Sequence, residues 1–186
     1  MRLPRINTFK SDPTGWIGSG VMLAFAAIAA WRWSQSELLY FALTALRDVA
    51  AAYFLLARRP ALTQLGSSRA VEMLAYVSSA LPLTYNVGHN NLTNLGAAAA
   101  NCVGIVGYAL ATFALLDLGE SFGVAPANRG IVRLGVYRWL RHPMYLGYSL
   151  AEAGFILLNQ SNAFLWLLST ALYSLRGRRE SQILRS

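Results

Sequence analysis

The chain is poor in cysteine, histidine, lysine and acidic residues. It has one cysteine, two histidines and eight acids among 186 residues. A single cysteine excludes an internal disulfide, and we expect Cys102, which lies in an apolar stretch, to be a small packing residue. We expect no metal or haem site, because His89 and His142 belong to opposite ends of the predicted helices.

Charged residues make up only 13% of the chain, whereas 55% is apolar and the mean hydropathy is +0.40. This balance excludes an ordinary soluble fold and predicts an integral membrane protein. The net charge of +8 falls in clusters between apolar runs, without the basic face of a nucleic-acid-binding protein, so we expect no nucleic acid partner. The length predicts one membrane domain, with transmembrane helices in 1–116 and a binding loop, hairpin and tail in 117–186.

The long apolar runs predict an all-α, polytopic membrane protein. A spanning helix needs about 20 apolar residues. Four stretches reach or approach that length: 16–33, 38–57, 70–83 and 95–116. Two shorter runs, 145–158 and 163–175, are separated by "NQSN" and predict a helical hairpin that dips into the membrane or crosses it. The predicted fold therefore has four transmembrane helices plus a C-terminal hairpin, or five to six membrane segments.

The cations predict the orientation. Arg2, Arg5 and Lys10 precede the first span, and Arg58, Arg59 and Arg69 lie between the second and the third. Arg129, Arg133, Arg138 and Arg141 follow the fourth span. Arg176, Arg178, Arg179 and Arg185 lie at the end of the chain. The other connections contain no cation. The positive-inside rule therefore predicts a multi-pass protein with both termini, and the segment after the fourth span, in the cytoplasm. The first residues lack an apolar leader and are expected to be a retained tail.

Two kinds of residue inside the spans predict packing. Small residues at helical spacing in the fourth span should form a face that lets another helix approach closely; they are Gly96, Ala100, Gly104 and Gly107. Charges at mid-membrane are costly and should pair internally. We therefore expect Arg47 to bridge to Asp48 or Glu72.

Glu152 is interpreted differently, because it shares a helical face with Tyr145 and Tyr148. We predict that this face lines a pocket at the cytoplasmic end of the hairpin, with Tyr148 and Glu152 contacting the substrate. The polar stretch 117–142 leads directly to that end. Pro143 suits the first turn of a helix and His142 the position before it. Helix N-terminal amides favour an anion, and Arg138 and Arg141 surround the same point.

The stretch "GIVRLGVYRWLRHPMYLG" resembles the signature of the isoprenylcysteine carboxyl methyltransferase family. That signature runs as Leu-Val, then Gly-x-Tyr, then Arg-His-Pro-x-Tyr-x-Gly. The preceding "LGESFGV" and the tail "RGRRESQIL" are similar to the family's flanking elements, so the resemblance covers about residues 118–184. Its members are multi-span enzymes that transfer a methyl group from S-adenosylmethionine to a lipophilic acceptor.

The resemblance implies the site residues. The cofactor-binding residues would be Arg129, Gly130, Ile131, Val132, Tyr137, His142, Pro143, Met144 and Tyr145, beside Arg141. In the tail, Glu180 would hold the cofactor and Arg176 would face the acceptor as the catalytic residue. Two positions depart from the family, since Ser181 stands in place of its second acid and Arg129 in place of its histidine. The first departure concerns acceptor recognition more than donor binding.

The residue types suit this chemistry by themselves. S-adenosylmethionine carries a carboxylate, which arginines and helix N-termini bind. Glu180 could take its amino group or ribose hydroxyls, and the ring of Tyr137 or Tyr145 could face the sulfonium. Methyl transfer by direct displacement needs no metal and depends mainly on alignment. The expected partners are membrane lipids and a lipophilic or amphipathic acceptor from the bilayer, while the oligomeric state stays open.

Three alternatives remain. Membrane sterol reductases that use NADPH have a similar Arg-His-Pro signature, but commonly carry an asparagine before the tyrosine and an acid after the glycine. Here Met144 and Tyr148 hold those places, which favours methyl transfer. A phospholipid N-methyltransferase would differ only in its acceptor. A non-enzymatic scaffold or small transporter is the third alternative, and a transporter would use the Arg47 and Asp48 pair.

Overall fold

The computed structural model describes residues 13–36, 38–59, 69–88, 94–124 and 128–183, and in this part of the chain it contains helices and no strand. The α-helices are α1 (Pro13–Ser36), α2 (Leu39–Ala57), α3 (Arg69–Ala80), α4 (Asn94–Leu118), α5 (Pro143–Leu158) and α6 (Ala163–Ile183). The short 3-10 helices are η2 (Leu81–Thr84), η3 (Gly119–Ser121), η4 (Gly135–Arg138) and η5 (Gln160–Asn162). The predicted all-α fold class is confirmed.

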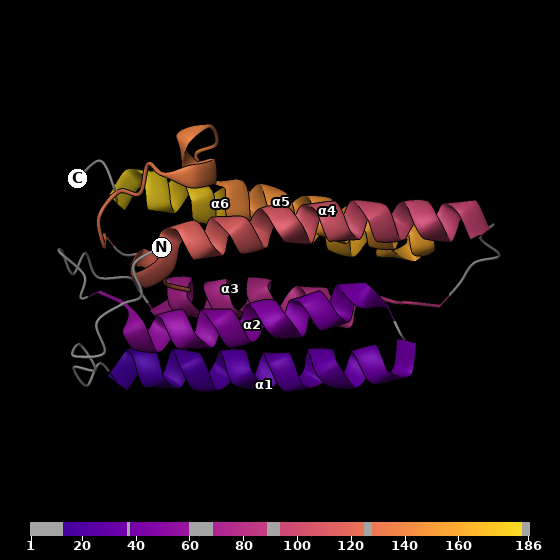
Figure 1. Ribbon diagram of the computed structural model, residues 1–186, viewed down its shortest axis with the longest axis horizontal. Coiled ribbons are helices and arrows are strands. Elements are labelled where there is room, and N and C mark those ends of the chain that lie inside the picture. The colour runs from indigo at the N-terminus through magenta and orange to yellow at the C-terminus, as the bar shows by residue number, and fades with distance from the viewer. Residues whose placement is uncertain (1–12, 37, 60–68, 89–93, 125–127, 184–186) are drawn as a thin grey trace.

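The helices form an elongated bundle in which successive helices run in opposite directions (Figure 1). α1 packs along α2 and α4 along α5, while α2 touches α4 and α3 touches α6. α1, α3 and α5 begin at the end of the bundle where α2, α4 and α6 finish, which we call the site end. α1 thus begins and α6 finishes at the same end of the bundle, as an even number of crossings requires. Which side faces the cytoplasm stays a prediction.

Within the described ranges, three helices are long and apolar enough to cross a membrane: Thr14–Ser36, Leu39–Ala57 and Leu95–Ser121. They correspond to the first, second and fourth predicted spans, and the chain is an integral membrane protein. The third predicted span contains only a shorter apolar helix, Met73–Thr84. α5 has 16 residues and therefore rises about 24 Å, less than the roughly 30 Å of hydrocarbon. The hairpin exists, but the number of full crossings stays a prediction.

α4 and α5 approach each other closely because small residues line their contact. A Cβ added to Gly107 of α4 would lie 2.7 Å from the Gly147 carbonyl oxygen and 2.7 Å from the Ala151 Cα of α5. A Cβ on Gly154 would lie 2.7 Å from the Ala100 carbonyl oxygen. The packing role predicted for this face of α4 is confirmed at Ala100 and Gly107. Cys102, expected to pack inside, is exposed, because α4 turns its small residues towards α5.

Charged and polar side chains occupy the interior of the bundle. Arg47 forms an ion pair with Asp48, with 3.1 Å between Nη2 and Oδ1, as predicted. Its Nη1 also donates to the Tyr148 hydroxyl at 3.1 Å. The side chain of Glu72, the other predicted partner, lies outside the described residues. Such pairing satisfies charges that would be costly in a bilayer.

Glu152 of α5 is a buried acceptor, with 1% of its surface exposed. The Tyr173 hydroxyl of α6 donates to its Oε1 at 2.6 Å, and the Tyr85 hydroxyl donates to its Oε2 at 2.8 Å. One carboxylate thus joins α5, α6 and the segment that follows η2. Both tyrosines are buried, and Glu152 accepts the shorter hydrogen bond of each hydroxyl, so the contact holds the interior together.

Arg32, near the end of α1, is a cation at the opposite end of the bundle that the predicted clusters leave out. Its guanidinium donates to the carbonyl oxygens of Leu83 and Tyr85, the latter at 2.6 Å, and lies 4.6 Å from the ring centre of Phe41. Helix C-terminal carbonyls attract cations. Arg32 therefore fixes the end of η2 to α1.

We expect Gly107→Ala to reduce the free energy of unfolding by at least about 1 to 3 kcal/mol, the usual cost of overpacking, because its methyl group would meet the α5 backbone. Gly20→Ala in α1 is the matched control, since an added Cβ there has nothing within 4 Å. Thermal unfolding in detergent measures both. A Gly107→Ala protein as stable as wild type would contradict the close α4 and α5 contact.

We expect Glu152→Leu to destabilise the protein, because it leaves the two buried hydroxyls with only their longer contacts, Tyr173 with the Ser78 carbonyl oxygen and Tyr85 with Ser169. A buried polar group that loses its partner costs about 1 to 3 kcal/mol. Glu152→Gln should cost less, since its amide oxygen still accepts from one tyrosine. Glu120→Leu is the control: it breaks a surface pair with Arg59, and such pairs contribute about 0 to 1 kcal/mol. Equal melting of Glu152→Leu and wild type would show that Glu152 holds nothing together.

Candidate active site

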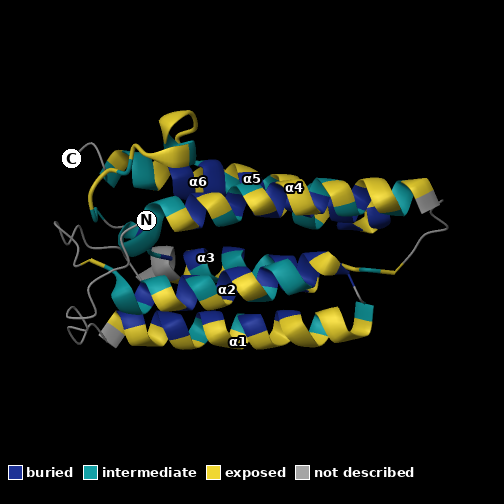
Figure 2. Ribbon diagram, viewed as in Figure 1, coloured by how far each residue is buried: buried dark blue, intermediate teal, exposed yellow. Residues whose placement is uncertain are grey.

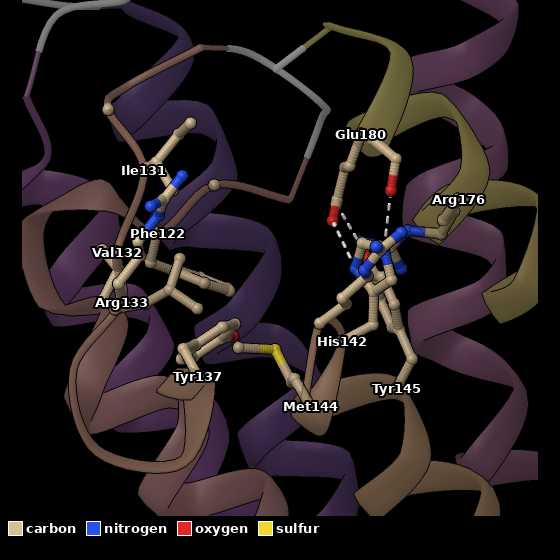
Figure 3. Close-up of a pocket in the computed structure, with 15 residues that line it drawn as sticks. Phe122, Ile131, Val132, Arg133, Tyr137, His142, Met144, Tyr145, Arg176 and Glu180 are labelled. Atoms are coloured by element: carbon tan, nitrogen blue, oxygen red, sulfur yellow. Dashed lines mark hydrogen bonds and ion pairs between the residues drawn. The ribbon is translucent and has the colours of Figure 1, made fainter. Parts of the chain in front are cut away.

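A cavity of about 410 Å³ opens at the site end, between the segment that joins α4 to α5 and the end of α6. In Figure 3, Ile131, Val132 and Arg133 form one side of it, and His142, Tyr145, Arg176 and Glu180 face them from the other. Its residues are Leu118, Phe122, Gly123, Gly130, Ile131, Val132, Arg133, Tyr137, Arg141, His142, Met144, Tyr145, Arg176, Glu180 and Ser181. This volume is within the range of small-molecule sites.

The cavity wall begins where α5 begins. Pro143 is the first residue of α5, as predicted, and His142 precedes it with a non-helical backbone, at φ −136° and ψ 60°. The His142 carbonyl oxygen accepts a hydrogen bond from Leu146 N at 3.2 Å. Gly177 of α6 makes room for the imidazole, because an added Cβ would lie 3.2 Å from His142 Cδ2. The start of α5 and the end of α6 are therefore in direct contact.

Four side chains link the start of α5 to the end of α6 in one wall of the cavity. The Tyr145 hydroxyl donates to Glu180 Oε1, and His142 Nε2 forms a 2.9 Å hydrogen bond with Ser181 Oγ. His142 Nδ1 lies 3.8 Å from Glu180 Oε2. Partial burial raises the pKa of the Glu180 carboxyl above its ordinary value, while the Tyr145 hydrogen bond and the nearby charges of Arg176 and His142 act in the opposite direction. Ser181 therefore binds the histidine where the family has an acid.

The opposite wall is fixed to α4 by one carboxylate. Asp117 Oδ2 accepts a 2.8 Å hydrogen bond from Val136 N. Gly135 has a φ of +55°, which favours glycine, and a Cβ there would collide with the Asp117 carboxylate. This contact places Tyr137 at the cavity. Burial raises the pKa of the Tyr137 phenol, and the charge of Glu180 adds to the effect, so its hydroxyl stays protonated.

Arg176 is buried, and its guanidinium holds three segments together. Nη1 donates to Ser78 Oγ at 2.9 Å and Nη2 to the Val124 carbonyl oxygen at 2.8 Å. The guanidinium carbon lies 5.1 Å from the ring centre of Tyr145. The ring of Tyr145 is in turn stacked on Tyr173 at 5.8 Å. Arg176 thus ties α6 to α3 and to the segment after η3, and the prediction that it faces the acceptor stays a prediction.

Most of the predicted site residues come together at this cavity. Those that line it are Gly130, Ile131, Val132, Tyr137, Arg141, His142, Met144, Tyr145, Arg176 and Glu180. Arg129 does not, and its carbonyl oxygen accepts from Ser121 Oγ at 3.4 Å. Pro143 does not either, because its ring is buried at the first turn of α5.

Tyr148 and Glu152 are not at the cavity. Both are buried deeper in the bundle, Tyr148 against Arg47 and Glu152 against Tyr85 and Tyr173. They share a helical face with Tyr145, but α2 and α6 cover that face below the first turn. The predicted pocket along it is therefore limited to Tyr145.

The cavity also contains residues that were not predicted: Leu118, Phe122, Gly123, Arg133 and Ser181. Phe122 and Gly123 belong to the "LGESFGV" element, so their position before the signature could have indicated them. Arg133 lies inside the signature. Leu118 is the last residue of α4 and the first residue of the same "LGESFGV" element.

A second hollow, of about 560 Å³, lies between α5 and α6. Arg141, His142, Tyr145 and Ser181 line both spaces and form the wall between them. The rest of its lining is Leu146, Ser149, Thr170, Tyr173, Ser174, Gly177, Arg178 and Gln182. We call it the hairpin groove.

No curated protein and no solved structure matches this chain. The model of the isoprenylcysteine carboxyl methyltransferase (ICMT) family matches residues 99–186. The matched segment contains the last part of α4, the whole cavity and both helices of the hairpin. Together with the apolar helices, the match indicates a membrane methyltransferase. Residues 99–186, slightly less than half of the chain, are therefore similar to the isoprenylcysteine carboxyl methyltransferase family.

Proposed function

We propose that the protein transfers a methyl group from S-adenosylmethionine to a lipophilic acceptor that enters from the bilayer. The observation that carries the proposal is the pair of hollows with a common wall. The cavity at the site end is the donor site, and the hairpin groove is the acceptor site. In direct displacement the acceptor nucleophile bonds to the methyl carbon as the bond from that carbon to sulfur breaks, so the two ligands would meet in line at the edge of this wall, beside Tyr145, and alignment is the main requirement.

The charges of the cavity suit the donor. Arg141 lies just before the start of α5, where a carboxylate is favoured by both its guanidinium group and the helix N-terminus. Arg133 lines the facing wall. Glu180 is the one acid among the residues that line the cavity, and its carboxylate would hold the donor ammonium. Gly130 lines the cavity with a φ of +96°, and a Cβ added there would have no atom within 4 Å, so this side of the cavity has open space.

The aromatic side chains complete the donor site. When bound, S-adenosylmethionine supplies an electrophilic methyl group on a sulfonium. Phe122, Tyr137 and Tyr145 offer ring faces, which attract cations. Tyr145 keeps its orientation because Glu180 accepts from its hydroxyl and Tyr173 stacks on its ring. We assign Arg176 to positioning, since it fixes α6 and lies over the same ring.

The hairpin groove suits an amphipathic acceptor. Leu146, half-exposed, lies on α5, while Ser149 and Thr170 share a 2.8 Å hydrogen bond across the hairpin. Arg141 and Arg178 lie at the end of the groove nearest the cavity wall. An acceptor whose apolar part lies along the hairpin would have its polar end at that wall.

The direct test is ligand-dependent unfolding of the purified protein. We expect S-adenosylhomocysteine to raise the melting temperature, because a ligand at a hundred times its Kd stabilises by about 2.7 kcal/mol, and NADPH to have no effect. Glu180→Gln and Tyr145→Phe should weaken binding at least tenfold by calorimetry. Glu120→Gln, an acid at the same end but outside the cavity, is the control. Stabilisation by NADPH alone would contradict the proposal.

We also expect donor binding to depend on pH through Glu180. Its pKa is raised in the folded protein, so the carboxylate that holds the donor ammonium becomes protonated as the pH falls from neutral into the acidic range. Affinity for S-adenosylhomocysteine should therefore fall with pH in wild type. Glu180→Gln should bind weakly with a flat profile. An equally steep profile in Glu180→Gln would assign the titration to another group.

A further inference from the structure

The segment 131–141 exposes apolar side chains in an otherwise irregular part of the chain. Leu134 is 76% and Trp139 80% exposed, and Ile131 and Leu140 are also exposed. The segment contains the short helix η4 and lies between α4 and α5. Large apolar side chains gathered on one exposed segment indicate a surface that contacts something.

The segment lies at the side of the bundle. In Figure 1 the loop with η4 stands out sideways from α4, α5 and α6, close to the site end but within the length of α4. Figure 2 shows it mostly exposed. α4 is long and apolar enough to cross the membrane, so a loop beside its end would lie at the depth of the lipid headgroups. Tryptophan and arginine both favour that depth.

The charge of the segment is positive. Arg133, Arg138 and Arg141 are exposed, and residues 131–142 contain no acid. The Arg138 guanidinium lies 5.4 Å from the ring centre of Trp139. The carboxylate of the neighbouring acid, Asp117, accepts a hydrogen bond from the Val136 amide. A basic cluster beside a bilayer attracts anionic headgroups by about 1 kcal/mol per cation.

We propose that residues 131–141 dock on the anionic surface of the bilayer, with Trp139, Leu134 and Leu140 among the headgroups and Arg138 at their phosphates. The same segment is a wall of the cavity, through Ile131, Val132 and Tyr137. On the basis of the proposed function, bilayer contact also stabilises the donor site. Lipid and donor then favour the same conformation, so each increases the affinity of the other.

The docking is tested by quenching of Trp139 with brominated phosphatidylcholine, taken as the difference between wild type and Trp139→Phe in nanodiscs. We expect quenching by bromine near the headgroup, weaker quenching by bromine deep in the acyl chain, and an increase when phosphatidylglycerol is added. Arg138→Gln should lose that increase, whereas Arg59→Gln, an exposed arginine at the same end, should keep it.

Absence of quenching at both depths would overturn the proposal. So would a Trp139 emission that shifts with protein concentration rather than with lipid, since that result would assign the surface to a second copy of the chain. Both measurements are independent of methyl transfer.

The coupling is tested by the affinity for S-adenosylhomocysteine in nanodiscs. We expect binding several-fold tighter with phosphatidylglycerol than with phosphatidylcholine alone, and the difference should disappear in Arg138→Gln, a residue outside the cavity lining. Equal affinity in both lipids would overturn the coupling. No binding in either lipid, with quenching intact, would overturn the proposed function and leave the docking surface standing.

Discussion

The close contact between the backbones of α4 and α5 is the constraint on which the site depends. Gly107 and Gly147 let the two helices run side by side, so the end of α4 and the start of α5 are fixed relative to each other. Asp117 projects from the first and His142 precedes the second. The segment between them has its two ends held at a set distance, and this converts a long irregular connection into the wall of a cavity.

The polar residues of the interior divide into two groups. One group, with Glu152, Arg47 and Arg176, makes hydrogen bonds or ion pairs that hold helices together within an apolar environment. The other group consists of Glu180 and Tyr145, which face the cavity and are hydrogen-bonded to each other. Tyr173 connects them, because it donates to Glu152 and stacks on Tyr145. The polar contacts inside the helix bundle therefore support the orientation of the residues at the site.

Features that depend on local chemistry could be predicted from the sequence. Pro143 began a helix as proline in a first turn should, the glycines of α4 made a packing face, and the signature residues gathered at one cavity. Features that depend on which helix covers a given face could not be predicted from the sequence. Helical periodicity put Tyr148 and Glu152 beside Tyr145, but it could not show that α6 buries them. The contacts of Arg176 with α3 likewise join residues about a hundred positions apart.

The central claim is that the cavity at the site end and the hairpin groove hold a methyl donor and a membrane acceptor on either side of one wall. The most direct measurement incubates the purified protein with S-adenosylmethionine labelled in its methyl group and a total membrane lipid extract. The account predicts label in a lipid-soluble product, and its loss in Tyr145→Phe and Glu180→Gln. Label found only in water-soluble products, or unchanged labelling in both variants, would contradict it.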